Sequence, residues 1–204
     1  DKHRLVLELI YSRDGLNWKR MPRRKPVLDV GPNGSWDRTN QSPAIGSPIV
    51  VGERMYMYYS GDTRYHGPYK GGDLGEVHGQ IGLGTLRLDG FVSMDATPRG
   101  GVLTTRLLQL DTVAELDAAI RLVVNVKSDN GHCRIELLDQ AGSPIAGYGK
   151  DDASDLVMDS VSAVASWNGK ADVRQFLQKP VRLRFHLQNA RLYSIRFKSG
   201  AASD

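Results

Sequence analysis

Cysteine is almost absent from this sequence: Cys133 is the single one among 204 residues. An internal disulfide framework needs cysteines in pairs, so that class of fold is excluded. Cys133 lies in the alternating stretch of residues 132–137, which is typical of a β-strand. We therefore expect a small, buried, apolar side chain. A nucleophilic cysteine would need an exposed position beside a base, which a mid-strand position disfavours.

Long apolar runs and helical periodicity are also missing. No stretch approaches the ~20 apolar residues of a membrane span, and no signal peptide is visible. The one helical signal is Asp172 as a cap before residues 173–177, which predicts a single turn ahead of Pro180. We expect an all-β chain with no membrane partner. Because the chain begins at Asp1, directly before a predicted strand, we also expect further residues upstream of it.

The sequence has no strong cluster of like-charged residues. Lys and Arg number 27 against 23 Asp and Glu, a net charge of +4. The nearest approach to a cluster lies within residues 19–25. Proteins that bind nucleic acid concentrate basic residues on one face, so we interpret this stretch as a solvated loop and expect no nucleic-acid partner.

The first half contains short apolar runs separated by turn residues, and one strand-turn-strand unit occurs twice. The two copies are residues 5–11 and 16–18 around Asp14-Gly15, and residues 81–86 and 91–93 around Asp89-Gly90. Asp-Gly is a strong hairpin signal because such turns need positive φ. Two further strands are predicted between the copies, at residues 45–51 and 55–60.

Four antiparallel strands form one blade of a β-propeller. The pattern therefore predicts that residues 1–98 are the C-terminal portion of a propeller, comprising its last blade and part of the preceding one. In such a meander the long segments 31–41 and 61–79 lie on one side. Long loops at one end of a rigid scaffold are where function concentrates.

The pattern of apolar and polar residues changes after residue 98. Residues 99–204 alternate more regularly, with strands predicted at residues 102–110, 120–127, 133–138, 161–167, 181–187 and 192–197. About six such strands with one polar face predict a β-sandwich. Trp167 ends an apolar strand, so we favour a core position for it over an exposed sugar platform.

Several segments in order resemble a known group of proteins. They are SRDGLNW (12–18), GSWD (34–37), YYSG (58–61), IGLGTLR (81–87), DGFVS (89–93), ELLD (136–139), PVRLRF (180–185) and RLYS (191–194). Together they resemble the C-terminal part of bacterial proteins similar to glycoside hydrolase families 32 and 43. Those proteins combine a five-bladed propeller with, in many members, a C-terminal β-sandwich.

The resemblance implies hydrolysis of glycosidic bonds in oligo- or polysaccharides. That chemistry needs two carboxyl groups flanking the bond. In the family they come mainly from earlier blades, so the catalytic residues of this chain stay unknown and the fragment alone is expected to be inactive. By analogy, the protein is secreted or periplasmic.

Two segments supply candidate substrate-binding residues. Trp36 and Asp37 place an aromatic ring beside a carboxylate, which suits the C–H faces and hydroxyls of a sugar; the alternative is an Asp that caps a turn. Asp62, Arg64 and His66 follow the strand at residues 55–60 and could line a pocket rim; the alternative is a glycine-rich loop without a ligand.

No cofactor or metal is predicted. The chain has no dinucleotide fingerprint or phosphate-binding glycine loop. His66, His78, Asp62 and Asp73 lack the spacing of a tight metal site. The acidic residues between 151 and 159 match no calcium loop, and solvated carboxylates explain them better.

Two other functions stay open. The chain could be a non-catalytic carbohydrate-binding protein. It could also be a structural domain that packs on the missing blades or self-associates through an open strand edge at residues 5–11, since unpaired edges invite pairing. Tyr11 and Trp18 are interpreted as aromatic residues that pack between blades.

Overall fold

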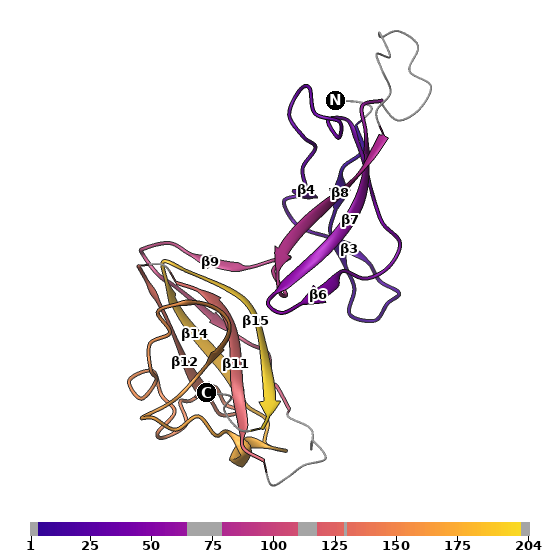
Figure 1. The fold of residues 1–204 in the computed structure, drawn as a ribbon. Helices are drawn as coiled ribbons and strands as arrows, with labels where there is room; N and C mark the ends of the chain where they lie inside the picture. The colour runs from indigo at the N-terminus through magenta and orange to yellow at the C-terminus, as the bar shows by residue number, and fades with distance from the viewer. Residues whose placement is uncertain (1–3, 65–78, 110–117, 129, 201–204) are drawn as a thin grey trace. The chain divides into compact units, whose positions relative to one another are not determined.

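The structure, a computed structural model, describes residues 4–64, 79–109, 118–128 and 130–200. These residues form antiparallel strands and turns, which confirms the all-β class. Their only helical element is the 3-10 turn η1 (Arg174–Phe176), at the position that the sequence indicates. None of the described residues forms a helix long and apolar enough to cross a membrane. The chain divides into two compact units, Asp1–Leu88 and Asp89–Asp204 (Figure 1).

The first unit starts with two short strand pairs. β1 (Leu7–Glu8) pairs with β4 (Pro26–Leu28), and β2 (Ile10–Tyr11) pairs with β3 (Lys19–Arg20). A hairpin around Asp14-Gly15 is therefore present, but its second strand is Lys19–Arg20 rather than the predicted residues 16–18. Residues 5–11 do not form the continuous open strand edge that the sequence predicts. A register shift at Leu7/Glu8 interrupts this stretch, and its parts pair with β4, with β3 and with Asn40.

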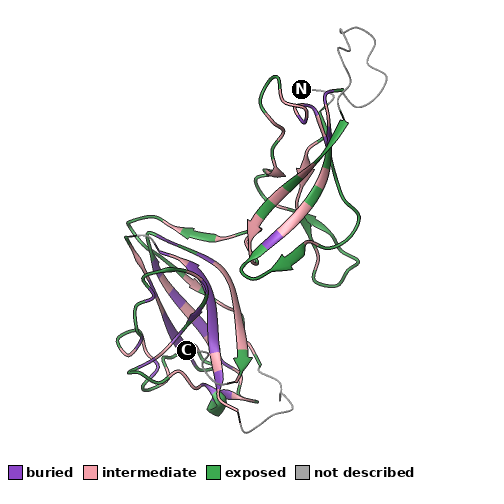
Figure 2. Cartoon of the chain, in the orientation of Figure 1, coloured by how far each residue is buried: buried purple, intermediate pink, exposed green. Residues whose placement is uncertain are grey.

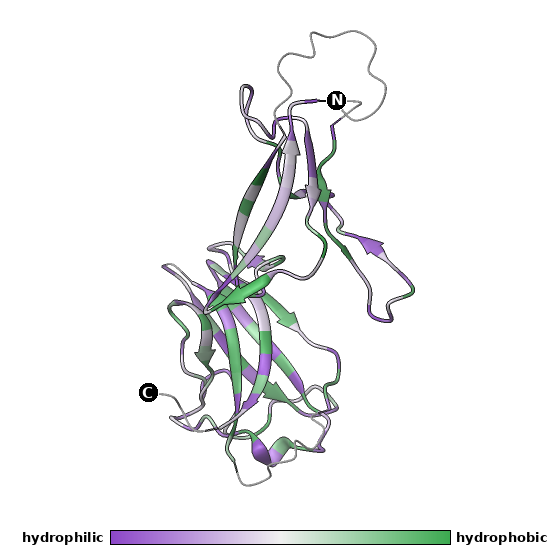
Figure 3. Ribbon diagram, turned by 45° about the vertical axis from the view of Figure 1, so that its right-hand side comes forward, coloured by the Kyte–Doolittle hydropathy of each residue, from purple (hydrophilic) through white to green (hydrophobic). Residues whose placement is uncertain are grey.

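The main sheet of the first unit is built around one long strand. β7 (Arg54–Asp62) pairs along one edge with β5 (Asn40–Pro43) and then β6 (Ile49–Val51), and along the other edge with β8 (Gly79–Arg87). A tight turn joins β6 and β7, with Gly52 at a positive φ of 56°. Figure 3 shows hydrophobic segments on the strands of this unit as well as on those of the second.

The predicted fourth strand at residues 91–93 is wrong. Asp89 does adopt the positive φ of a turn, at 53°. The chain then runs on to β9 (Met94–Ala96), which pairs with β15 (Ala190–Ser199) of the second unit. Side chains of β15 also reach the turn, since Ser194 Oγ donates to Asp89 Oδ2 at 3.0 Å. Hence the division between the units falls earlier than the boundary predicted after residue 98.

The second unit contains two antiparallel sheets. One has the order β10 (Gly101–Thr104), β14 (Arg182–Gln188), β12 (His132–Leu138). The other has the order β13 (Asp159–Val164), β11 (Ile120–Lys127), β15, β9. Buried side chains of both sheets belong to a single apolar cluster, among them Leu122, Ile135 and Phe185. Figure 2 shows the buried residues concentrated on these strands.

Two single-residue predictions about this core are confirmed. Cys133 is fully buried, and burial together with the nearby charge of Asp155 raises the pKa of its thiol to about 12. Trp167 is also buried, with its indole Nε1 donating to the carbonyl oxygen of Ile135 at 2.7 Å and its ring against Tyr148. A buried indole that finds an acceptor is the arrangement expected of a core tryptophan.

The aromatic residues Tyr11 and Trp18 are exposed. Packing between blades, as the sequence predicts for them, would need a neighbouring blade, so it stays a prediction. Trp18 Nε1 instead donates to the carbonyl oxygen of Gly15 at 3.0 Å, which ties the ring to its own turn.

Candidate functional site

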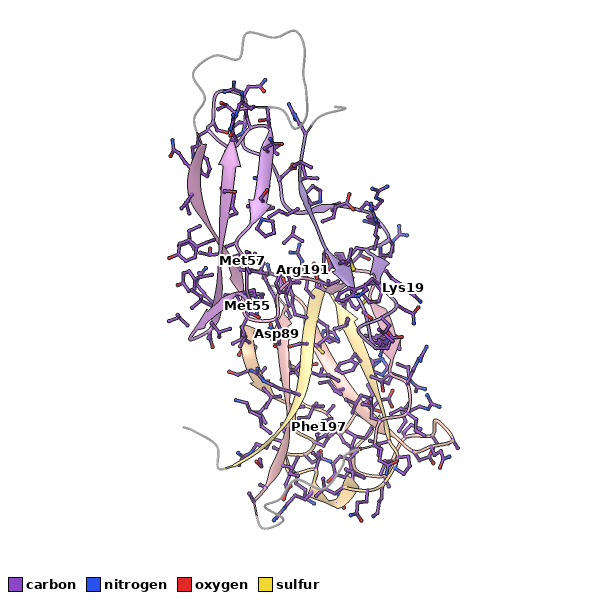
Figure 4. The ribbon with its side chains drawn as sticks, turned by 90° about the vertical axis from the view of Figure 1, so that its right-hand side faces the viewer. Lys19, Met55, Met57, Asp89, Arg191 and Phe197 are labelled. Carbon is purple, nitrogen blue, oxygen red and sulfur yellow. The ribbon has the colours of Figure 1, made fainter. Side chains whose placement is uncertain are left out.

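The register of the main sheet determines which residues share a face. Side chains alternate along a strand, and directly paired residues of antiparallel strands project to the same side. Met55, Met57 and Tyr59 of β7 therefore lie on one face, and Figure 4 labels the two methionines. Tyr58 and Ser60 lie on the other. We call these two sides of the sheet the Tyr59 face and the Tyr58 face.

Asp37 packs on the Tyr59 face as a buried carboxylate. Only 8% of the residue is exposed. Its Oδ1 accepts a hydrogen bond from Ser35 Oγ at 2.8 Å, and its Oδ2 accepts one from Tyr59 Oη at 2.9 Å. Trp36 stacks on Tyr59, with ring centroids 5.6 Å apart and an interplanar angle of 18°. The connection between β4 and β5 is thus fastened to β7.

Glycine at position 61 makes this close approach possible. A Cβ on Gly61 would lie 2.5 Å from both the Trp36 ring and Asp37 Cβ. No real side chain tolerates such a distance, so the Trp36–Asp37 segment lies directly over the bare backbone of β7. The glycine of the YYSG segment is therefore needed so that Trp36 and Asp37 can pack against β7.

The hydrogen bonds keep Asp37 ionised. Burial opposes the charge, but the hydroxyl donors Ser35 and Tyr59 outweigh it and hold the pKa of Asp37 below its usual value. Burial, followed by the hydrogen bond to Asp37 and its charge, raises the pKa of Tyr59. Both carboxylate oxygens of Asp37 thus have protein donors, which favours an anchoring role for this residue.

A pocket of about 390 Å³ opens at the same end of β7, mainly on the Tyr58 face of the sheet. Its polar lining consists of Asn40, Ser42, Ser60, Asp62 and Gln80, and its apolar lining includes Leu5 and Ile81. Asn40 pairs with Asp62 and Ser42 pairs with Ser60 across β5 and β7, so these four side chains share the Tyr58 face. Leu5 joins them through a parallel bridge to Asn40.

Asp62 is the carboxylate of this pocket. Arg64 donates to it from Nη2 at 2.8 Å and from its backbone N at 2.7 Å. The side-chain hydrogen bond from Arg64 is the main reason that the pKa of Asp62 lies below its usual value, although burial opposes it. Thr39 Oγ1 contacts the carbonyl oxygens of Asp62 and Arg64 and holds the strand end in place. Asp62 is therefore an ionised acceptor with a fixed position.

An unsatisfied acceptor lies next to Asp62. The Oδ1 atom of Asn40 is buried and has no hydrogen-bond partner in the part of the chain that the structure describes. Buried acceptors normally have a donor, so a ligand hydroxyl or an amide would be stabilised there. Asn40 therefore marks the pocket as a place for a hydrogen-bonding ligand.

The predicted site residues are separated in the structure. Trp36 and Asp37 lie on the Tyr59 face, whereas Asp62 lies on the Tyr58 face with its partner Arg64. His66 lies outside the described residues. Asn40, Ser42 and Ser60 are not among the residues predicted from the sequence. The polar residues at 40 and 42, and at 60 and 62, do repeat with the two-residue period of a strand face.

Three acidic residues between positions 151 and 159 have protein partners. Asp155 pairs with Arg134, Asp159 with Lys127, and Asp152 accepts from Asn168 Nδ2 at 2.8 Å. Within the ranges that the structure covers, no three His, Cys, Asp or Glu side chains gather as metal ligands would.

No protein-family model, curated protein or solved structure matches this chain, so its function is inferred from the chemistry of the pocket.

Proposed function

We propose that the first unit binds carbohydrate in the pocket of Asn40 and Asp62, and that the chain is part of a glycoside hydrolase. The observation that carries the proposal is the ionised Asp62 beside Asn40 Oδ1, a buried acceptor with no hydrogen-bond partner among the described residues. Sugar hydroxyls donate and accept hydrogen bonds, and Ser42 and Ser60 supply groups that do both. Leu5 and Ile81 add apolar surface for the C–H groups of a sugar ring.

Catalysis is assigned to residues outside the described pocket. Glycosidic hydrolysis needs two carboxyl groups about 5–10 Å apart on either side of the bond. Asp62 is the one carboxylate among the described lining residues, and Asp37 projects from the other face of the sheet. The pocket on its own therefore supports binding. A non-catalytic carbohydrate-binding protein is the alternative, and it has the same pocket.

We also propose a propeller blade for the first unit and a β-sandwich for the second. In the first unit, β5 and β6 pair with one edge of β7, and β8 pairs with the other edge. This antiparallel sheet supports a propeller blade whose outermost strand is absent from the described residues. The two sheets of the second unit with their common apolar cluster support a β-sandwich. Binding residues often lie where the strands of a rigid scaffold meet its loops, and Asn40 and Asp62 lie at the ends of β5 and β7.

Calorimetric titration of the chain with a panel of neutral oligosaccharides tests this proposal. Asp62→Ala and Asn40→Ala should each weaken the binding of a sugar ligand about tenfold, because each removes an acceptor that a ligand hydroxyl would use. Asp37→Asn is the matched control, since it changes a carboxylate on the other face. Circular dichroism would establish that the variants fold.

Two results would count against the proposal. Sugar affinity that is the same in Asp62→Ala and the wild type would remove the pocket as the binding site. Hydrolysis by this chain alone would show that the catalytic carboxylates are not elsewhere. If the complete protein binds sugars but cleaves none of them, the non-catalytic alternative holds.

A further inference from the structure

We infer that β8 is an assembly edge, along which a second copy of this chain adds its own β8 in antiparallel orientation and joins two first-unit sheets into one. The inference does not rest on the proposed function. It follows from the composition of the strand, the exposure of its side chains and the register that a two-fold axis imposes.

The outer edge of β8 lacks the usual protection. In the part of the chain that the structure describes, β8 pairs with β7 alone. Strand edges are normally blocked by charged residues, proline or bulges. Residues 79–86 contain no charge and no proline, and the pairing with β7 runs from Gly79 to Arg87 without a register shift. A nine-residue strand with these properties is a template for another strand.

The Tyr58 face next to this edge is apolar and exposed. Ile81 is 78% exposed and Leu83 is 48% exposed. Tyr58 is the direct partner of Leu83 on β7, and Ile49 of β6 lies on the same face because it pairs with Tyr56. Tyr58 and Ile49 are also exposed. Apolar side chains at this edge would make cross-strand contacts with those of an added strand, which stabilise strand pairing.

A second copy fits this edge in a self-complementary register. With the two-fold axis at Leu83, Leu83 faces the partner subunit's Leu83, and Ile81 faces the partner subunit's Thr85. The exposed residues of both copies then form one continuous stripe on the same side of the joined sheet. An isologous contact of this kind closes on itself and leaves no further free β8 edge.

Charge also favours the second copy as the occupant. Arg87, the one charged residue of β8, would lie opposite the partner subunit's Gly79. Gly79 pairs with Asp62, so the backbone of Arg87 would lie two strand spacings, about 10 Å, from that of the partner subunit's Asp62. The two copies of Arg87 would lie at opposite ends of the contact. The two like charges are thus kept apart along the contact.

Light scattering after size exclusion, over a range of concentrations, tests the interface. The wild-type chain should form dimers. Leu83→Lys should raise the dimer dissociation constant at least tenfold, because a charged edge residue prevents strand pairing. Val157→Lys is the matched control: Val157 is 57% exposed and lies outside the described strands. A wild-type chain that stays monomeric at millimolar concentration, or a dimer unaffected by Leu83→Lys, would overturn the inference.

Disulfide cross-linking provides a second test that does not depend on a destabilising change. The native Cys133 is buried and its thiol pKa is raised, so it should not react. Under mild oxidation, Leu83→Cys should form a covalent dimer across the two-fold axis, whereas Val157→Cys should not. Equal cross-linking of the two variants would refute pairing at Leu83.

Discussion

At the scale of single residues, the same side-chain type has two roles in the first unit. Asp37 is buried and bonded to Ser35 and Tyr59, whereas Asp62 lines a pocket and is bonded to Arg64. Both pKa values lie below the usual one, but different donors cause the two shifts. A lowered pKa is therefore not sufficient to identify a functional carboxylate, and the site is assigned from the pocket and its unsatisfied acceptor.

The anchoring role of Asp37 predicts a defined response to acid. A carboxyl whose folded pKa is depressed stabilises the fold above its unfolded pKa, about 3.9, and this contribution is lost as pH falls through the folded pKa. The free energy of unfolding should therefore fall below about pH 4. In Asp37→Asn this acid-dependent part should be smaller, as measured by urea unfolding at several pH values.

Tyr59→Phe provides the matched change from the donor side. It removes the hydroxyl and leaves the ring that stacks on Trp36. At neutral pH we expect a loss of about 1–3 kcal/mol, typical of a hydrogen bond to a charged group. An unchanged free energy of unfolding in Tyr59→Phe would show that Asp37 does not anchor the segment.

At the scale of elements, identical turn signals lead to different pairings. Asp14-Gly15 joins β2 and β3 as a hairpin, and the Asp14 carboxylate accepts from the backbone N of Leu16 and of Asn17. Asp89-Gly90 also turns, but the strand after it pairs with β15. A turn sets the local change of direction, while the partner of the following strand depends on what surface is available to it.

The pairing of β7 with β8 supplies a prediction at this scale. A Cβ on Gly82 would lie 2.4 Å from the Tyr59 ring, whereas one on Gly84 would lie 3.6 Å from its nearest neighbour, the carbonyl oxygen of Met57. Gly82→Ala should therefore destabilise the first unit by about 1–3 kcal/mol, the usual effect of overpacking. Gly84→Ala should be close to neutral. Urea unfolding of both variants measures the difference, and equal effects would contradict the packing of Tyr59 over Gly82.

At the scale of the whole molecule, the two units differ in how much they bury. The second unit contains the large apolar cluster around Leu122, Ile135 and Phe185. Among the described apolar side chains of the first unit, Met55 alone is buried. Because burial of apolar surface is the main stabilising term in folding, the units should differ in independent stability.

Expressing the units separately tests this difference. Residues 89–204 should fold alone and unfold in one cooperative thermal transition, followed by circular dichroism. Residues 1–88 should show no comparable transition as a monomer, and should gain stability with concentration if β8 pairs with a second copy. A residue 1–88 fragment with a concentration-independent transition as steep as that of residues 89–204 would contradict this.

The sequence by itself determined the all-β class, most strand positions, the helical turn near Phe176 and the burial of Cys133 and Trp167. These follow from local periodicity and turn chemistry, which act within a few residues. Only the tertiary structure decided that Asp37 and Asp62 lie on opposite faces, that Asn40 joins Asp62, and that residues 94–96 pair with β15. Those outcomes depend on register and on contacts between distant segments, and a one-residue change of register moves a side chain to the other face of a sheet.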